Sequence, residues 1–366
     1  MKPLRRIAFV VEDFAVPSPA QQLLDRFLIG YPRDGAFHRL ENCRVSIRMV
    51  DGSENAEIKR REKEFKLRVG RSLGQAIAGA NGVIVALRGS GAHANDELLR
   101  EVLRSVPSGA PCFLHGALGT SLDAAQQTAK LASSRRVALA AGTPLGVTWK
   151  LPLAEIPMGM PLKEALVVVQ GSAPAAEFEA LEGLLPLIER RQGGETGIRQ
   201  VQFFQGNELW RAGGEDQWSW PLLASALSRS DTPQGDPVKD GRTQDLVGLG
   251  LVPKLAREPR GWVIEHRDGL RSTILVLDGV VADYNFAVRT SDGRIVSAQI
   301  YRPPAPTAHH FTRLAEVIED FFRTHKQPWP LERSLLLSGL LQMIRNPTAQ
   351  NGRPIETPTL KISYSG

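Results

Sequence analysis

Two glutamates in one predicted helix are candidates for proton transfer. Glu179 and Glu182 are three residues apart in the helix predicted over residues 175–190, so they share one of its faces. Two ionised carboxyl groups this close repel each other, which raises the pKa of one and suits it to act as a catalytic acid or base. The alternative is that both are exposed acids at a helix start, where the helix dipole favours negative charge.

An aromatic residue and a cation stand together where the first half of the chain ends. Trp149 and Lys150 could place an aromatic wall and a catalytic cation against a ligand, or they could be a boundary tryptophan and a surface lysine. Glu195 follows Gly193 and Gly194 in a turn, so it is a candidate ligand-binding residue or a turn residue only.

His310 is a further catalytic candidate, at the start of the helix predicted over residues 310–323. It could also cap or pack that helix together with His309. A metal site would need a third ligand, and no HxH, HExxH or CxxC spacing supplies one, so none is predicted. Cys43 and Cys112 show no CxxC spacing either, which favours a reducing compartment.

The first 150 residues alternate short apolar runs with helical patterns. This rhythm predicts parallel strands joined by right-handed crossovers, hence a Rossmann-like doubly wound sheet in a domain over residues 1–150. The predicted strands are 7–11, 44–50, 83–87, 112–114 and 137–140, and the predicted helices are 21–29, 57–69, 72–78, 95–105 and 121–132.

The pattern changes after residue 151. Four strands over residues 261–301 are separated by Asp-Gly pairs at 268, 278 and 292, which is typical of hairpin turns and predicts an antiparallel meander. Further predictions are strands at 166–170 and 199–204, a loop over 230–260, and helices at 175–190, 221–228, 310–323 and 331–344. We therefore expect an α+β domain over residues 151–366 with an open, largely antiparallel sheet, on which the C-terminal helices pack back.

The composition is that of an ordinary folded protein. The 366 residues suffice for two domains with separate cores. Lys and Arg exceed Asp and Glu by 45 − 39 = 6, which permits an anionic ligand but does not indicate nucleic acid. The first apolar run, residues 7–11, is too short for a signal peptide or a membrane span of about 20 residues. We expect a cytoplasmic protein with no nucleic-acid or membrane partner.

Several stretches of the chain resemble parts of a known family. Residues 72–87 resemble the family's third strand and the helix before it, residues 111–121 the segment with its Glu-Lys-Pro motif, and residues 318–356 its last helices and end strand. Over nearly its whole length, the chain is similar in this way to the glucose–fructose oxidoreductase and inositol dehydrogenase (Gfo/Idh/MocA) family. Residues 141–150 and 189–197 look like a divergent, uncharacterised bacterial branch of it.

The resemblance implies NAD or NADP as cofactor and a sugar- or cyclitol-type ligand held between the domains. It also implies a homodimer or higher homo-oligomer formed through the second-domain sheet. His93 matches the family's histidine after the third strand, and His115 lies beside the position of the Glu-Lys-Pro lysine, which is Gly116 here. Asp51 follows the second strand, where an acid could bind the cofactor ribose, or it is a turn residue. These three histidine and aspartate residues are the cofactor-binding candidates.

The chain departs from the family where the cofactor phosphates would bind. The glycines of G-x-G-x-x-G correspond to Val11, Asp13 and Val16, and Glu12 and Asp13 add two carboxylates. Two like charges about 4 Å apart repel by roughly 1 kcal/mol in water and by more when desolvated, so a diphosphate is disfavoured there. The alternative for these acids is that they cap the next helix. Glu179 also stands where the family has its catalytic histidine.

Two hypotheses follow for the function. The first is an oxidoreductase-like enzyme in which Lys150, Glu179, Glu182 and His310 rebuild the site, with or without a dinucleotide; a non-redox lyase or isomerase fits as well. The second is a non-catalytic ligand-binding or partner subunit with the same fold.

Overall fold

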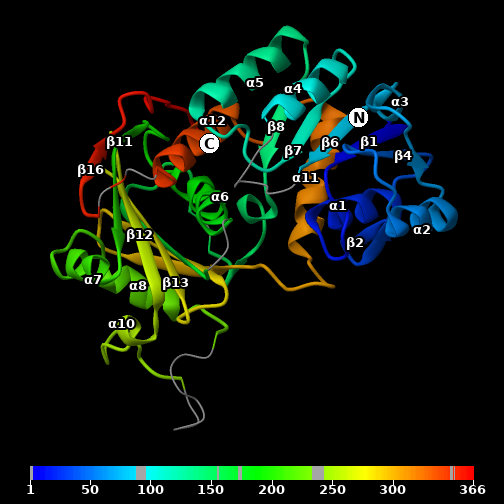
Figure 1. Cartoon of the computed structure of the whole chain (residues 1–366). Coiled ribbons are helices and arrows are strands. Elements are labelled where there is room, and N and C mark those ends of the chain that lie inside the picture. The colour runs from blue at the N-terminus through cyan, green and yellow to red at the C-terminus, as the bar shows by residue number, and fades with distance from the viewer. Residues whose placement is uncertain are drawn as a thin grey trace. The chain divides into compact units, whose positions relative to one another are not determined.

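The computed structural model describes residues 3–87, 96–154, 156–171, 175–232, 243–346, 349 and 351–366. The chain divides into two compact units, which Figure 1 shows coloured along the sequence. The first unit joins Met1–Val147 to Pro303–Ser338, and the second joins Thr148–Arg302 to Gly339–Gly366. The predicted boundary after residue 150 falls close to this division, but a C-terminal segment belongs to the first unit. The assignment of one part to a cofactor and the other to a substrate stays a prediction.

A six-stranded parallel sheet forms the centre of the first unit, in the order β5-β4-β1-β6-β7-β8. Its strands are β1 (Arg6–Val11), β4 (Arg44–Met49), β5 (Arg68–Val69), β6 (Gly82–Ala86), β7 (Cys112–His115) and β8 (Leu139–Gly142). The strand order reverses between β1 and β6. Both strands are apolar and buried nearly throughout, as parallel strands with helices on both faces must be. The predicted Rossmann-like sheet is confirmed.

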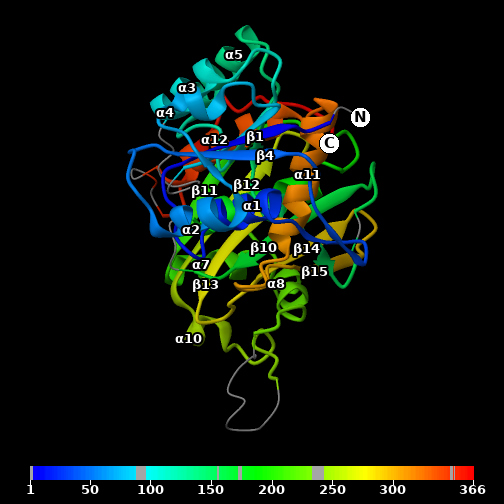
Figure 2. The ribbon, with the colours of Figure 1, turned by 90° about the vertical axis from the view of Figure 1, so that its right-hand side faces the viewer.

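Helices cover both faces of this sheet. One face packs against α1 (Pro19–Leu28), α2 (Ala56–Phe65) and α11 (His310–Thr324), and the other against α3 (Leu73–Ile77), α4 (Asp96–Ser105) and α5 (Leu122–Ser134). Figure 2 shows α1 and α11 side by side, although they lie far apart in the sequence. The hairpin of β2 (Tyr31–Arg33) and β3 (Ala36–His38) follows α1, and a 3-10 turn (Pro144–Gly146) follows β8.

The second unit contains an eight-stranded mixed sheet in the order β16-β11-β12-β13-β10-β14-β15-β9. Its strands are β9 (Lys150–Leu151), β10 (Leu162–Val169), β11 (Ile198–Gln205), β12 (Arg257–His266), β13 (Arg271–Asp278), β14 (Tyr284–Thr290), β15 (Ile295–Ile300) and β16 (Pro354–Glu356). Among the described strands of this sheet, only β10 and β13 pair in parallel, so the prediction of a largely antiparallel sheet is confirmed.

The predicted meander over residues 261–301 is wrong at one step. The turns at Asp268-Gly269 and Asp292-Gly293 join neighbouring strands, and Gly269 and Gly293 take the positive φ of +90° and +89° that such turns need. The pair Asp278-Gly279 does not close a hairpin, because β10 lies between β13 and β14. A long-range strand thus replaces the expected local pairing.

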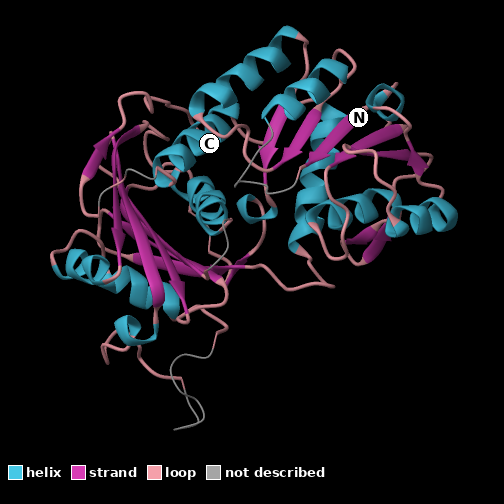
Figure 3. Ribbon diagram, viewed as in Figure 1, coloured by secondary structure: helices cyan, strands magenta, loops and turns pink. Residues whose placement is uncertain are grey.

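Both faces of the second sheet are covered within the unit (Figure 3). The helix α6 (Ala176–Ile188) packs on one face, and α7 (Asn207–Gly214), α8 (Trp220–Leu227) and α10 (Val252–Leu255) pack on the other. The central strands are therefore buried on both sides: six of the eight residues of β13 are buried. The homo-oligomer formed through the second-domain sheet stays a prediction.

Smaller differences from the sequence prediction have local causes. The helix predicted over 57–69 ends at Phe65 because Lys66 adopts the left-handed conformation, with φ of 59°, and Arg68 and Val69 then form β5. The loop predicted over 230–260 contains α10 and the start of β12, and α7 was not predicted. The last helix, α12 (Leu331–Ile344), agrees with its prediction. None of the described helices has the length and apolar character needed to cross a bilayer.

Candidate functional site

Glu179, in the first turns of α6, meets two side chains from the end of the second sheet. Its Oε1 accepts a hydrogen bond from Arg302 Nη2 at 3.1 Å, and its Oε2 accepts one from the Tyr284 hydroxyl. Arg302 Nη1 also donates to the Tyr284 hydroxyl at 3.3 Å, and the guanidinium lies 5.1 Å from the centre of the tyrosine ring. We call these three residues the Glu179 cluster.

The Glu179 cluster combines a fixed acceptor with two fixed donors. Burial and the negative charge of Glu179 raise the pKa of Tyr284 well above its ordinary value, so its hydroxyl stays protonated. The side chains of Glu179 and Arg302 keep 20% and 35% of their surface exposed. A carboxylate can accept about four hydrogen bonds, so Glu179 can still accept donors from a ligand. The cluster is suited to bind hydroxyl groups.

Glu182 lies one turn further along the same helix and is buried. The alternative of two exposed acids is therefore wrong for this residue. The contacts of Glu179 pair it with the cation of Arg302, which offsets the expected repulsion between the two glutamates. A catalytic role for Glu182 stays a prediction.

Trp149 and Lys150 lie at the edge of the second sheet, beside the strand that leads to the Glu179 cluster. Lys150 pairs with Ile300 in the β9–β15 ladder, and Arg302 follows two residues later. Burial lowers the pKa of Lys150 to about 8, and its Nζ donates to the Thr148 carbonyl at 3.0 Å. Trp149 is 43% exposed and meets the Tyr301 ring edge-on at 6.4 Å. The roles of Trp149 as an aromatic wall and of Lys150 as a catalytic cation stay predictions.

His115 and His310 are brought together in the first unit by one aromatic ring. His115 ends β7, and its ring stacks on Phe311 with centroids 5.8 Å apart; the His310 ring lies 4.8 Å from Phe311. Both histidines are buried. Burial lowers the pKa of His115 to about 4, so this imidazole is neutral at physiological pH. Its Nε2 has no hydrogen-bond partner in the described part of the chain.

The remaining cofactor candidates are not gathered with these residues. Asp51 is exposed in the turn after β4, where its Oδ1 accepts the Ser53 amide at 2.9 Å. His93 lies outside the described residues. Their cofactor roles stay predictions.

Glu195 forms the centre of a buried charged cluster. It is 1% exposed and accepts hydrogen bonds from the Thr196 and Gly197 amides at 3.0 and 2.8 Å. Arg191 Nη1 lies 3.1 Å and His266 Nδ1 3.0 Å from its oxygens. Burial alone would raise the pKa of Glu195, but His266 and Arg191 lower it to about 2. These contacts account for Glu195 as a structural group, and its ligand-binding role stays a prediction.

The loop between β1 and α1 does not fit a dinucleotide diphosphate. Such a group needs backbone N–H groups on a loop that lets it approach closely. Here the Glu12 amide donates to the Ala86 carbonyl at 3.2 Å, and the Phe14 side chain fills the loop at 1% exposure. Pro17 and Pro19 carry no amide hydrogen.

The start of α1 has its own cap. Ser18 accepts the Gln21 amide at 3.2 Å, as a helix N-cap does. The alternative that Glu12 and Asp13 cap this helix is therefore wrong, since the cap lies several residues further on. The Gln22 amide donates to the Ser18 carbonyl at 2.9 Å, so the amides of Gln21 and Gln22 are both engaged by the chain itself.

Sequence reasoning missed Tyr284 and Arg302, because neither belongs to a motif and each reaches Glu179 only through the fold. Among the described residues, no group of His, Cys, Asp and Glu has the arrangement of a metal site.

The chain is similar to known proteins in its structure and not in its sequence. No family model and no curated protein sequence matches the chain. The GenD2 protein of gentamicin A biosynthesis, solved with NAD, is 16% identical with a TM-score of 0.57, over 98% of this chain and 97% of that chain. A myo-inositol dehydrogenase from Lactobacillus casei, solved with NAD(H) and myo-inositol, is 12% identical with a TM-score of 0.55, over 97% and 99%. A probable dehydrogenase from Thermotoga maritima is 11% identical with a TM-score of 0.56, over 96% and 98%.

The match covers both units and both sheets of the chain, and at this level of identity it concerns the fold. Together with the strand order of the first sheet, it shows that this chain has the fold of the Gfo/Idh/MocA-type dehydrogenases.

Proposed function

We propose that the protein binds a sugar- or cyclitol-type polyol at the Glu179 cluster, without the family's standard dinucleotide contacts. The observation that carries this proposal is the partly exposed carboxylate of Glu179, held between the Tyr284 hydroxyl and the Arg302 guanidinium. A polyol hydroxyl both donates and accepts hydrogen bonds, so it can donate to Glu179 and accept from Arg302. The nearby exposed face of Trp149 adds an apolar surface for a ring.

The resemblance supports this location. It puts Glu179 where the family has its catalytic histidine, and one structural neighbour of this chain was solved with myo-inositol. The β1–α1 loop does not fit a dinucleotide diphosphate, which argues against hydride transfer to or from a dinucleotide bound there as in the family. Electrostatic repulsion from Glu12 and Asp13 would oppose the phosphates.

A non-redox lyase or isomerase reaction is the second candidate function. Lys150 favours it, because a pKa of about 8 leaves this amine partly neutral near physiological pH and able to accept a proton. In such a reaction Lys150 would accept the proton, while Glu179 would accept a hydrogen bond from a substrate hydroxyl and Arg302 would donate one to it.

Calorimetric titration of the full chain with myo-inositol tests the proposal. We expect saturable binding that Glu179→Gln weakens by roughly tenfold, because one charge-assisted hydrogen bond is lost. Glu62→Gln on the exposed face of α2 is the matched control and should leave binding unchanged. Parallel titrations with NAD⁺ and NADP⁺ should give no binding heat.

Each outcome bears on the proposal. Absence of binding to myo-inositol and to a panel of related polyols would exclude the polyol site. Binding that survives Glu179→Gln unchanged would place the ligand elsewhere. Tight binding of NAD⁺ would overturn the argument from the β1–α1 loop.

A further inference from the structure

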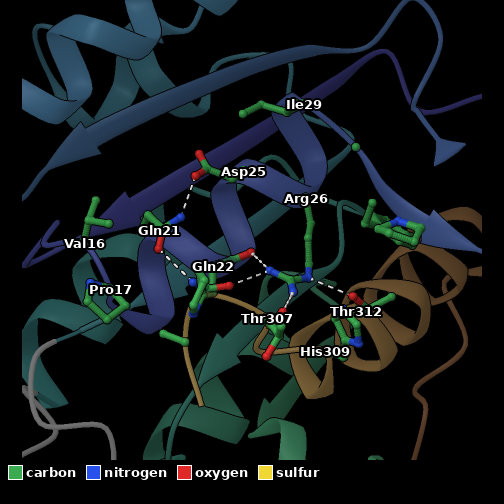
Figure 4. Close-up of a pocket in the computed structure, with 15 residues that line it drawn as sticks. Val16, Pro17, Gln21, Gln22, Asp25, Arg26, Ile29, Thr307, His309 and Thr312 are labelled. Carbon is green, nitrogen blue, oxygen red and sulfur yellow. Dashed lines mark hydrogen bonds between the residues drawn. The ribbon is translucent and has the colours of Figure 1, made fainter. Parts of the chain in front are cut away.

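A cavity lies within the first unit and shares no residue with the Glu179 cluster. It has a volume of about 640 Å³ and runs along α1, between that helix, the start of β2 and residues 305–312 at the start of α11. Figure 4 shows Arg26 extending from α1 toward Thr307 and Thr312 on the opposite wall, with Gln22 beside it and Gln21 directed toward Asp25. Nothing in the sequence pattern pointed to this cavity.

The acidic group of this cavity, Asp25, is bound by a neighbouring arginine. Arg61 donates to both carboxylate oxygens of Asp25, from Nε at 2.6 Å and from Nη2 at 2.7 Å. Gln21 Nε2 donates to the same carboxylate at 2.6 Å, and Gln22 Nε2 donates to Gln21 Oε1 at 3.0 Å. Arg61 also pairs with Glu57 at 2.7 Å, so it is shared between two carboxylates, but both oxygens of Asp25 have donors.

Arg26 is a cation whose hydrogen-bond partners are all neutral. Its guanidinium donates to the Gln22 side-chain and backbone oxygens, both at 2.8 Å, and to Thr312 Oγ1 at 3.1 Å. The second Nη donates to the Ala308 carbonyl at 2.9 Å and only weakly to the Thr307 carbonyl at 3.5 Å. Burial lowers the pKa of this group to about 10, although it remains charged at physiological pH.

The charged residues lining the cavity are one cation, Arg26, and one carboxylate, Asp25, whose oxygens already accept from Arg61 and Gln21, so the hydrogen-bonding groups left for a ligand are mostly donors. Gln21 and Gln22 each use one amide hydrogen in these bonds and keep a second. Thr312 Oγ1 accepts from Arg26, and its own hydrogen has no acceptor in the described part of the chain. His309 is exposed and lines the mouth of the cavity. A partly desolvated cation surrounded by donors attracts an anionic oxygen group.

We propose that this cavity binds a small oxyanion, a carboxylate or a phosphate, with Arg26 as its countercharge and Gln21, Gln22 and Thr312 as donors. On binding, Arg26 Nη2 gives up its weak hydrogen bond to the Thr307 carbonyl and donates to a ligand oxygen instead. The site is independent of the polyol proposal, because all of its residues belong to the first unit.

Calorimetric titration of the full chain with inorganic phosphate and, separately, with citrate tests this site and distinguishes the two oxyanions. We expect one of them to bind at a single site and to bind more weakly as salt is raised. His309→Glu adds a carboxylate at the mouth and should weaken binding by roughly tenfold. Gln126→Glu, an equal charge change on α5 at the other face of the sheet, should leave it unchanged. Arg26→Gln should abolish binding.

The opposite results would overturn the proposal. Absence of saturable binding for both anions excludes an oxyanion site. Equal affinity in the wild type and in His309→Glu shows that an anion binds elsewhere, and this comparison holds even if Arg26→Gln fails to fold. Binding of myo-inositol that His309→Glu abolishes and Glu179→Gln leaves intact would assign this cavity to the polyol instead.

Discussion

The buried charges around Glu195 show how single residues depend on their surroundings in this protein. A carboxylate at 1% exposure is tolerated because two amides, Arg191 and His266 satisfy it. Arg191 is in turn held by Asp268 at 2.7 Å, and His266 by Ser272 at 2.9 Å. The network ties the turn after α6 to the β12–β13 hairpin.

Acid should weaken the fold through Glu195. Its pKa is about 2 in the folded chain against an ordinary value of 4.5, so its stabilisation is complete above pH 4.5 and is lost as the pH falls toward 2. This shift corresponds to about 3 kcal/mol. We expect Glu195→Gln to lower the free energy of unfolding by about that amount at pH 7 and by much less near pH 2. Denaturant unfolding at both pH values measures this, with Glu62→Gln as the control; a cost equal at both would contradict it.

Lys150 should react with acylating reagents at a lower pH than an ordinary lysine. With a pKa of about 8, its amine is about half neutral at pH 8, whereas an ordinary lysine with a pKa of 10.5 is almost wholly protonated. We expect its labelling rate, followed by mass spectrometry, to rise with a midpoint near pH 8. The exposed Lys130 on α5 serves as the reference. Labelling of both lysines with the same pH midpoint would show that Lys150 is not perturbed.

At the scale of elements, two glycines of the first unit differ in the space around them: one is closely packed between a strand and a helix, and the other is open. A Cβ added at Gly82 in β6 would lie 2.2 Å from the Phe322 ring of α11. A Cβ added at Gly74 in α3 would meet nothing within 4 Å. The contact at Gly82 lets α11 lie flat against the sheet.

The two glycines should respond in opposite directions to alanine. We expect Gly82→Ala to destabilise the chain by about 1–3 kcal/mol through overpacking, and Gly74→Ala to stabilise it by roughly 0.5–1 kcal/mol by restricting the unfolded chain. Thermal unfolding of both variants measures the effects. A neutral Gly82→Ala would show that Phe322 can move aside at no cost.

In the whole molecule, each of the two units contains its own apolar core. The first unit is held by apolar residues on both faces of its parallel sheet, and the second by a cluster that includes the fully buried Trp218, whose Nε1 donates to the Leu209 carbonyl at 2.9 Å. Each unit has a core of its own, as independent folding requires.

Removing the Trp218 side chain should therefore affect the second unit selectively. We expect Trp218→Ala to cost about 3–5 kcal/mol and to lower one of two transitions in scanning calorimetry. Phe113→Ala, in the fully buried centre of the first sheet, should lower the other transition. A single transition that both variants shift equally would show that the two units unfold as one.

The sequence by itself determined the features that depend on neighbouring residues. Alternating apolar runs and helical patterns predicted the Rossmann-like sheet, and Asp-Gly pairs predicted two of the hairpins, because turn chemistry and periodicity act over a few residues. The sequence also showed that the stretch after β1 is acidic and contains no glycine, because this depends only on which residues are present.

Only the tertiary structure decided the features that join distant segments. β10 inserts between β13 and β14, and Tyr284 and Arg302 meet Glu179 across 105 and 123 residues. The cavity beside Arg26 likewise needs α1 and residues 307–312, which are more than 280 residues apart. Local propensity carries no information about such pairings, because they are fixed by the burial and hydrogen bonding that the whole fold provides at once.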